Sequence, residues 1–163
     1  MDPYALFKIP LQNHLSQDAV VGVWITHKAK YRAFVIEKLF AAWGLEFVAE
    51  WCWIKTTIHG DLMFDPSLKN RKSYEVLLIG RRKASGLQPS LTDSIPKQLF
   101  FASVPSVHHS QKPFLDSLLA PYINKNAAKL ELFARIVRSG WTSWGNECLK
   151  FNEAPFLEER VSR

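Results

Sequence analysis

The chain has 163 residues, which is enough for one domain with a sizeable hydrophobic core. Apolar residues make up 47% of it and aromatic residues 13%, a composition that excludes a disordered chain. The net charge of +6 suits a polyanionic partner. The sequence has no apolar run of the ~18 residues that span a membrane, and its N-terminus lacks a secretory signal. We therefore expect a nuclear or cytoplasmic protein that is neither secreted nor bound to a membrane.

The first third of the chain predicts short turns, a strand and a helix. Pro3 and Pro10 break any long helix near the start. Residues 19–26 form an apolar, β-branched run that is typical of a buried strand. Residues 27–43 place apolar side chains three and four positions apart, which predicts an amphipathic helix. Gly44 then ends that helix as a C-terminal cap.

Residues 45–56 predict a second strand, with Phe47, Trp51 and Trp53 alternating onto one face. Strand, helix and strand in this order make a βαβ unit, for which we expect a right-handed crossover. Glu50 lies inside the apolar strand, where a carboxylate needs a partner. It is therefore either paired structurally or directed at a binding site.

The middle of the chain alternates polar loops with two more strands. Residues 58–72 predict a loop whose length favours a binding role. Residues 74–80 predict a third strand, and residues 85–96 a surface loop. Residues 97–104 predict a fourth strand. Together these elements indicate an α/β sheet with helices on its faces.

The C-terminal part places polar residues at the ends of apolar elements. Residues 112–120 predict a short helix that begins at Lys112, with its apolar side chains inward; these are Phe114, Leu115, Leu118 and Leu119. Residues 130–135 predict a fifth strand that ends on Arg135. Residues 141–151 predict a short final strand and a turn. Because ligands of open α/β sheets lie beyond the strand ends, we expect these polar residues to converge on one edge.

Each polar residue also has a purely structural explanation. Lys112 at a helix start suits a carboxylate or a phosphate, or it is simply exposed. The guanidinium of Arg135 could hold a carboxylate or hydroxyls, or it pairs with Glu131 or Glu147. Asn146 follows a glycine, so a tight turn is a sufficient explanation for it.

Several other kinds of chemistry find no support in the sequence. It contains no Gly-x-Ser-x-Gly, P-loop or Gly-x-Gly-x-x-Gly motif, which disfavours hydrolases, NTPases and nicotinamide enzymes. Cys52 and Cys148 lack metal-ligand spacing and fit two buried thiols. His108 and His109 are adjacent and point to opposite faces of an extended chain, so we expect no metal site.

Tryptophans and basic runs leave two interpretations open. The six tryptophans serve either as core filling or as a platform for stacking a base; they are Trp24, Trp43, Trp51, Trp53, Trp141 and Trp144. The basic runs 69–72 and 81–83 are either solvated loop or strand ends, or contacts to a polyanion.

Four segments between Tyr4 and Phe151 resemble a known family, the adenine N(6)-methyltransferases named after the seventy-kilodalton subunit of the mRNA adenosine methyltransferase. Within it the chain is most similar to the methyltransferase-like four branch. The most specific pieces are the Lys-Pro pair, the ELFAR strand and the WTSWGNE turn. The full segments are WITHKAKYRAFVIEKLFAAWGLEFVAEWCWIKT, YEVLLIGR, SVHHSQKPFLDSLLAPYI and KLELFARIVRSGWTSWGNECLKF.

The resemblance implies a Rossmann-like, S-adenosylmethionine-dependent methyltransferase fold with permuted motif order. Such a domain would cover residues 1–151, followed by a flexible tail over residues 152–163. The family methylates the exocyclic amine of adenine in RNA or DNA, and we expect RNA over DNA, a nuclear location and a possible partner subunit. Neither a membrane nor a metal is implied.

By the same resemblance, Lys112 meets the amino-acid end of the cofactor, and Arg135 and Asn146 face its nucleoside. Glu147 stands where relatives place a further polar contact, and Arg138 departs from the family residue at its position. Three residues of the 58–72 loop would bind phosphate of the substrate; they are Lys69, Arg71 and Lys72.

The family's catalytic motif, Asp-Pro-Pro-Trp, does not occur in this sequence, where Asp2-Pro3-Tyr4 is a partial echo. We therefore expect no catalytic residue here and a sheet that lacks the N-terminal catalytic strand. One explanation is a truncated sequence whose true start lies upstream. Another is an inactive relative that binds nucleic acid or acts as a scaffold subunit, and a third is a marginal fold without function.

Overall fold

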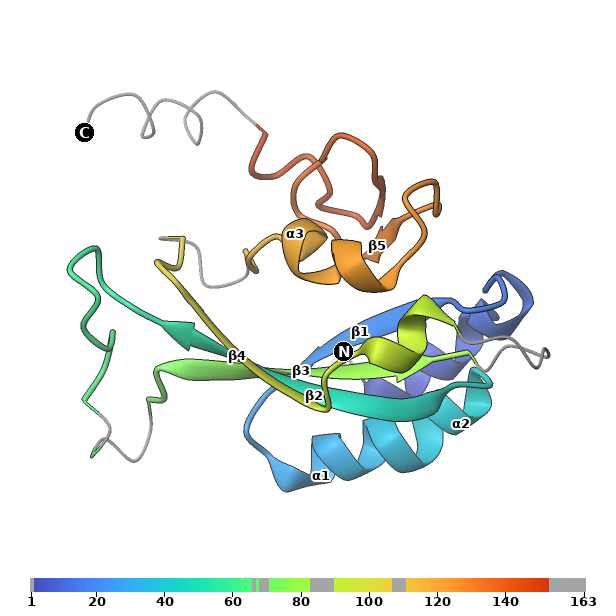
Figure 1. Cartoon of the computed structure of the whole chain (residues 1–163), viewed down its shortest axis with the longest axis horizontal. Helices are drawn as coiled ribbons and strands as arrows, with labels where there is room; N and C mark the ends of the chain where they lie inside the picture. The colour runs from blue at the N-terminus through green and yellow to red at the C-terminus, as the bar shows by residue number, and fades with distance from the viewer. Residues whose placement is uncertain (1, 66, 68–70, 83–89, 107–110, 153–163) are drawn as a thin grey trace. The chain divides into compact units, whose positions relative to one another are not determined.

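The computed structural model describes residues 2–65, 67, 71–82, 90–106 and 111–152 (Figure 1). They form two compact units. The sheet unit comprises Met1–Val104 and Leu115–Asn124, and the C-terminal unit comprises Pro105–Phe114 and Lys125–Arg163. The expected C-terminal tail lies almost wholly outside the described residues, so the predicted boundary after Phe151 stays a prediction.

The sheet unit contains four strands in the order β1-β3-β2-β4. Their bounds are β1 Val20–Ile25, β2 Glu46–Lys55, β3 Tyr74–Arg81 and β4 Gln98–Ser103, which confirms the four predicted strands. β3 runs antiparallel to both β1 and β2, while β2 and β4 are parallel. β1 and β2 are thus parallel to each other, as a βαβ unit requires, but β3 is inserted between them.

One face of the sheet is covered by the predicted helix, which runs without a break through α1 (Ala29–Ala33), the π-helical turn η3 (Phe34–Leu39) and α2 (Phe40–Ala42) (Figure 1). Its apolar stripe packs on Leu78 of β3. The N-terminal segment adds two 3₁₀ turns to this face, η1 (Pro3–Lys8) and η2 (Leu11–Asn13), as its prolines predict.

The helix ends in a Schellman motif at Gly44. The Gly44 N–H donates to the Ala41 carbonyl at 3.1 Å, and the Leu45 N–H donates to the Phe40 carbonyl at 2.8 Å. Gly44 has φ +67°, and a Cβ at this position would meet nothing within 4 Å. The need for glycine is therefore conformational rather than steric.

Gly44→Ala is expected to lower the free energy of unfolding by about 1–2 kcal/mol, because a Cβ strains the left-handed conformation without adding a contact. Gly44→Asn is the matched control and should cost less, since asparagine tolerates this conformation better. Urea denaturation measures both changes. Equal losses for the two variants would contradict the conformational explanation.

The opposite face of the sheet holds the second core, around Trp51, Leu77 and Ile79. It is covered by α3 (Asp116–Leu119), η4 (Leu91–Ser94) and η5 (Ala120–Tyr122). Trp43, Trp51 and Trp53 are 4%, 0% and 2% exposed, which confirms core filling for these three. Trp144 is 55% exposed, so core filling does not apply to it.

The predicted alternation of Phe47 with Trp51 and Trp53 is wrong. A β-bulge shifts the register between Phe47, which pairs with Gly80, and Ala49, which pairs with Ile79. Since neighbouring residues of β3 face opposite sides, the extra residue turns Phe47 to the other face of the sheet. Phe47 is 37% exposed there.

The predicted helix start at Lys112 is also wrong, because α3 begins only at Asp116. Leu115, Leu118 and Leu119 pack on the second core, and so short a helix forms only where tertiary packing supports it. Phe114 was expected to point inward, yet it is 46% exposed and belongs to the C-terminal unit.

The C-terminal unit contains a parallel pair of short strands, β5 (Leu130–Leu132) and β6 (Thr142–Trp144). β6 confirms the predicted final strand. β5 ends before Arg135, contrary to the prediction, because Phe133 adopts φ 59° and turns the chain out of the extended conformation. The mixed α/β class is confirmed, whereas the permuted motif order and the missing catalytic strand stay predictions.

Candidate cofactor and nucleic-acid sites

The C-terminal unit brings Arg135 beside the turn that follows β6. Phe133 turns the chain, and the buried Ala134 donates its N–H to the Trp144 carbonyl at 3.0 Å. Arg135 Nη2 then lies 3.4 Å from Glu147 Oε2. The structural alternative foreseen for Arg135 is therefore present, and it also joins two of the residues expected to bind cofactor.

Gly145 fixes this arrangement through close backbone packing. A Cβ on Gly145 would lie 3.0 Å from the Ala134 carbonyl oxygen and 3.1 Å from Phe133 Cα. Because these are backbone atoms, they cannot give way as a flexible side chain would. The glycine thus lets the turn lie against residues 133–134. Asn146, which follows it, is exposed.

Glu147 is held in its charged form. Lys150 Nζ lies 2.7 Å from Glu147 Oε1. This hydrogen bond, followed by the positive charges of Lys150 and Arg135, lowers the pKa of Glu147. The carboxylate is accordingly ionised at neutral pH and available as an acceptor for hydroxyl groups.

Arg138 holds the segment that carries Lys112. Its guanidinium carbon lies 4.6 Å from the ring centroid of Phe114 and 4.4 Å from that of Trp141. Its Nη2 lies 2.7 Å from Glu131 Oε2, and its side chain is only 13% exposed. Arg138 therefore ties the end of segment 111–114 to the residues between β5 and β6.

Sequence reasoning treated Arg138 only as a departure from the family. Two features of the sequence could have pointed to its contacts. Arg138 lies three residues before Trp141, and aromatic Phe114 follows the Lys-Pro pair. Lys112, two residues before Phe114, lies in the same unit as Arg135, Asn146 and Glu147.

This donor set fits S-adenosylmethionine by its chemistry. An ammonium at Lys112 and a guanidinium at Arg135 suit a carboxylate or hydroxyl acceptor. The Asn146 amide can donate to ring nitrogens, and the ionised Glu147 can accept from ribose hydroxyls. The close packing at Gly145 holds the stretch that carries Asn146 and Glu147 against Phe133 and Ala134, the two residues before Arg135.

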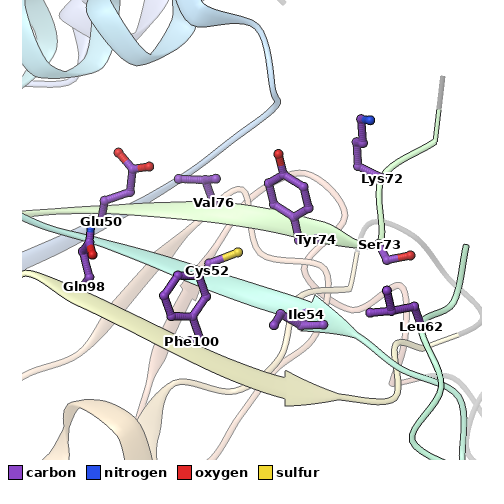
Figure 2. A pocket seen from close by; sticks show the side chains of 10 residues that line it. All are labelled: Glu50, Cys52, Ile54, Leu62, Lys72, Ser73, Tyr74, Val76, Gln98 and Phe100. Carbon is purple, nitrogen blue, oxygen red and sulfur yellow. The ribbon is translucent and has the colours of Figure 1, made fainter. Parts of the chain in front are cut away.

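The sheet unit contains a separate cavity of about 480 Å³ on the face of β2, β3 and β4 that carries Cys52, Val76 and Phe100 (Figure 2). Cys52 pairs with both Val76 and Phe100 in the strand register. Glu50 lines the cavity and forms an ion pair with Arg32, whose Nε lies 2.8 Å away. The predicted structural pairing of Glu50 is confirmed.

The environment of Cys52 favours its neutral thiol form. Burial, and after it the negative charge of Glu50, raises the pKa of Cys52.

The predicted loop over residues 58–72 is anchored beside this cavity by Ser73. Ser73 Oγ donates to the Phe64 carbonyl and accepts from the Phe64 N–H, both at 2.7 Å. Leu62 forms an isolated bridge with Thr56, and the Met63 N–H donates to the Lys55 carbonyl at 3.0 Å. These contacts set Leu62 and the end of the loop against the cavity.

The three phosphate-binding candidates of this loop have different outcomes. Lys72 lines the cavity. The guanidinium of Arg71 lies 5.5 Å from the ring centroid of Phe64. Lys69 lies outside the described residues.

The second basic run has a structural role. Arg81 forms ion pairs with Glu46 at 2.6 Å and with Asp93. Arg82 donates to the carbonyls of Gln12 at 3.0 Å and Leu15 at 2.5 Å. These contacts favour the strand-end interpretation for this run over a polyanion contact.

Among the residues that the structure describes, His, Cys, Asp and Glu form no group of three or more that could hold a metal ion. None of the described helices has the length and apolar character to cross a membrane. The predicted non-ligands His108 and His109 lie outside this part of the chain.

Residues 1–147 match the MT-A70 family model. An α/β sheet, followed by a glycine-dependent turn that presents clustered polar side chains, agrees with that match. The chain belongs to the MT-A70 family, as the sequence resemblance predicted.

Several curated relatives carry adenine methyltransferase names. The chain is 37% identical to mouse N(6)-adenine-specific methyltransferase METTL4 over 162 residues, covering 96% of this chain and 34% of the relative. It is 39% identical to N6-methyladenosine RNA methyltransferase MTA1 of Cryphonectria parasitica, covering 93% and 44%. It is 34% identical to the DNA N6-methyl methyltransferase of Caenorhabditis elegans, covering 90% and 39%. The chain thus spans about a third of the length of the METTL4 relatives.

Proposed function

We propose that this chain is the cofactor-binding and substrate-facing part of an S-adenosylmethionine-dependent N(6)-adenine methyltransferase that acts on nucleic acid, with RNA preferred over DNA. The observation that carries the proposal is the meeting of Arg135 and Glu147 beside the Gly145–Asn146 turn. Membership of the MT-A70 family supports it. The nuclear location expected from the sequence stays a prediction.

In this proposal Lys112 pairs with the cofactor carboxylate, while Arg135 and Asn146 contact its nucleoside. Glu147 accepts hydrogen bonds from ribose hydroxyls, since its lowered pKa keeps it ionised. When bound, the cofactor supplies the methyl group for transfer to the adenine amine. Arg138 acts as a positioning residue, because it stacks on Phe114 and so holds the segment of Lys112.

A second function is the alternative that the sequence analysis left open, since the printed sequence contains no Asp-Pro-Pro-Trp motif. The family motif supplies the groups that hold the target amine, and none of the residues described above replaces them. The alternative is a catalytically inactive subunit that binds nucleic acid or serves as a scaffold in a methyltransferase complex. Cofactor binding alone does not separate the two functions, because an inactive subunit with a preserved site binds the cofactor as an active enzyme does.

Calorimetry with S-adenosylmethionine tests the proposed cofactor site. Lys112→Ala and Arg135→Ala are each expected to weaken binding about 10- to 150-fold, because each removes a charged hydrogen bond worth about 1.5–3 kcal/mol. Lys125→Ala, an exposed lysine of the same unit, is the matched control and should leave the affinity unchanged. No binding by the wild-type chain would contradict the proposed cofactor site and favour a scaffold.

Methyl transfer to an adenine-containing RNA and to the same DNA sequence separates the two functions. Activity on RNA above DNA supports the enzyme as proposed. Binding of the cofactor without methyl transfer to the RNA or to the DNA supports the inactive subunit.

A further inference from the structure

We propose that the cavity on β2, β3 and β4 binds an unpaired base of the substrate strand, stacked on Phe100, with an adjoining phosphate at Lys72. The proposal rests on the proposed function in one respect, that the substrate is a nucleic acid. It adds that the substrate is single-stranded where it meets this chain, and it assigns the stacking to a cavity of the sheet unit.

The first argument is an aromatic ring that is left open to solvent on a rigid strand. Phe100 is 68% exposed and Tyr74 is 39% exposed, although both lie on paired strands. Figure 2 shows Phe100 beside Cys52 and Ile54, with Tyr74 further along the same cavity. Each exposed ring offers a π-face, which is the feature that stacks any base.

The rings are held in place before a ligand arrives. Phe100 pairs with Cys52 in β2, and Tyr74 pairs with Ile54, so the strand register fixes their spacing. The ring of His27 packs against Tyr74 edge to face, with centroids 4.4 Å apart. A preorganised platform lowers the entropy that binding must overcome.

The second argument is the polar chemistry at the two ends of the cavity. Gln98 and Glu50 lie at one end, and Lys72 and Ser73 lie at the other (Figure 2). The Gln98 amide offers both a donor and an acceptor, which matches the hydrogen-bonding edge of a base. Lys72 supplies the positive charge that a backbone phosphate requires.

Size and charge favour a nucleotide over a purely apolar ligand. A volume of about 480 Å³ falls within the range of small-ligand pockets. The chain carries a net charge of +6, and two further basic residues, Lys69 and Arg71, precede Lys72 in the sequence. An apolar side chain of a protein partner would not interact with these positive charges, whereas the phosphate of a nucleotide would.

The test is a titration of the 163-residue chain with a fluorescein-labelled, adenine-containing RNA dodecamer, followed by anisotropy. Phe100→Ala is expected to weaken binding about 5- to 150-fold, the loss for about 1–3 kcal/mol of stacking. Phe100→Trp should retain binding. Ile58→Ala, which removes an apolar side chain that is 79% exposed and outside the cavity, is the control and should not change it.

Lys72→Ala should weaken binding and lower the slope of log affinity against log salt by about 0.7, the value for one phosphate contact on a single strand. The same RNA in a perfect duplex should bind more weakly than the single strand, because its bases are already stacked and paired. Circular dichroism melts of each variant verify that the sheet unit stays folded.

Three results would overturn the proposal: no binding of the dodecamer by the wild-type chain, equal affinity for Phe100→Ala and Ile58→Ala, or equal affinity for single strand and duplex. If Phe100→Ala changes the oligomeric mass of the protein in light scattering but not its affinity for RNA, this face is a protein interface instead. Calorimetry with S-adenosylmethionine tests the proposed function independently of this titration. Phe100→Ala should leave the affinity for the cofactor unchanged.

Discussion

Replacing Trp51 by alanine is expected to lower the free energy of unfolding by about 3–5 kcal/mol, the usual cost of removing a fully buried indole. Trp51 is 0% exposed in the middle of β2. It packs with Leu77 and Ile79, and its ring meets Tyr122 edge to face at 6.1 Å between centroids. The substitution leaves a cavity where the sheet contacts α3 and η5.

Part of the loss comes from a hydrogen bond. Trp51 Nε1 donates to the Pro96 carbonyl at 2.9 Å, and alanine leaves that acceptor without its partner. The matched control is Phe100→Ala on the neighbouring strand β4, where the removed ring is 68% exposed. We expect this control to cost about 1 kcal/mol or less. Urea denaturation of both variants decides the point, and similar losses for the two would contradict the burial argument.

The second large effect is expected for Gly145→Ala. The new Cβ would lie 3.0 Å from the Ala134 carbonyl oxygen, so the turn after β6 must move away from residues 133–134. Overpacking of this kind costs about 1–3 kcal/mol. Because the displaced backbone carries Asn146 and Glu147, we also expect the affinity for S-adenosylmethionine to fall by roughly tenfold or more.

Thr142→Ala is the matched control, since it shortens an exposed side chain of β6 and adds no atom against the backbone. Hydrogen–deuterium exchange should become faster over β5 and β6 in Gly145→Ala and stay unchanged over the sheet unit. Calorimetry gives the cofactor affinity. A Gly145→Ala variant with the affinity and the exchange of Thr142→Ala would show that the turn does not depend on this contact.

Local patterns in the sequence predicted most elements correctly. Apolar runs located all four strands of the sheet, and spacings of three and four located the helix that ends at Gly44. The same reasoning was wrong at Phe47, because a single bulge residue inverts the face of everything before it. It was also wrong at Lys112, since a helix as short as α3 depends on what it packs against.

For the candidate sites, the sequence singled out Arg135 and Glu147. It left open whether Arg135 pairs with Glu131 or with Glu147, and the structure shows the pair with Glu147. The sequence could not foresee the left-handed conformation of Phe133, which lies against the turn after β6. Nor could it identify the cavity at Phe100. The residues that line this cavity come from three strands and a loop, and their meeting depends on strand register.

The sequence by itself determined the four strands of the sheet, the helix that ends at Gly44 and membership of the MT-A70 family, because these depend on local composition and spacing. Only the tertiary structure decided the order β1-β3-β2-β4, the stacked Arg138 and the exposed ring of Phe100. Such features arise from backbone hydrogen bonds and packing between residues far apart in the chain, which no local pattern encodes.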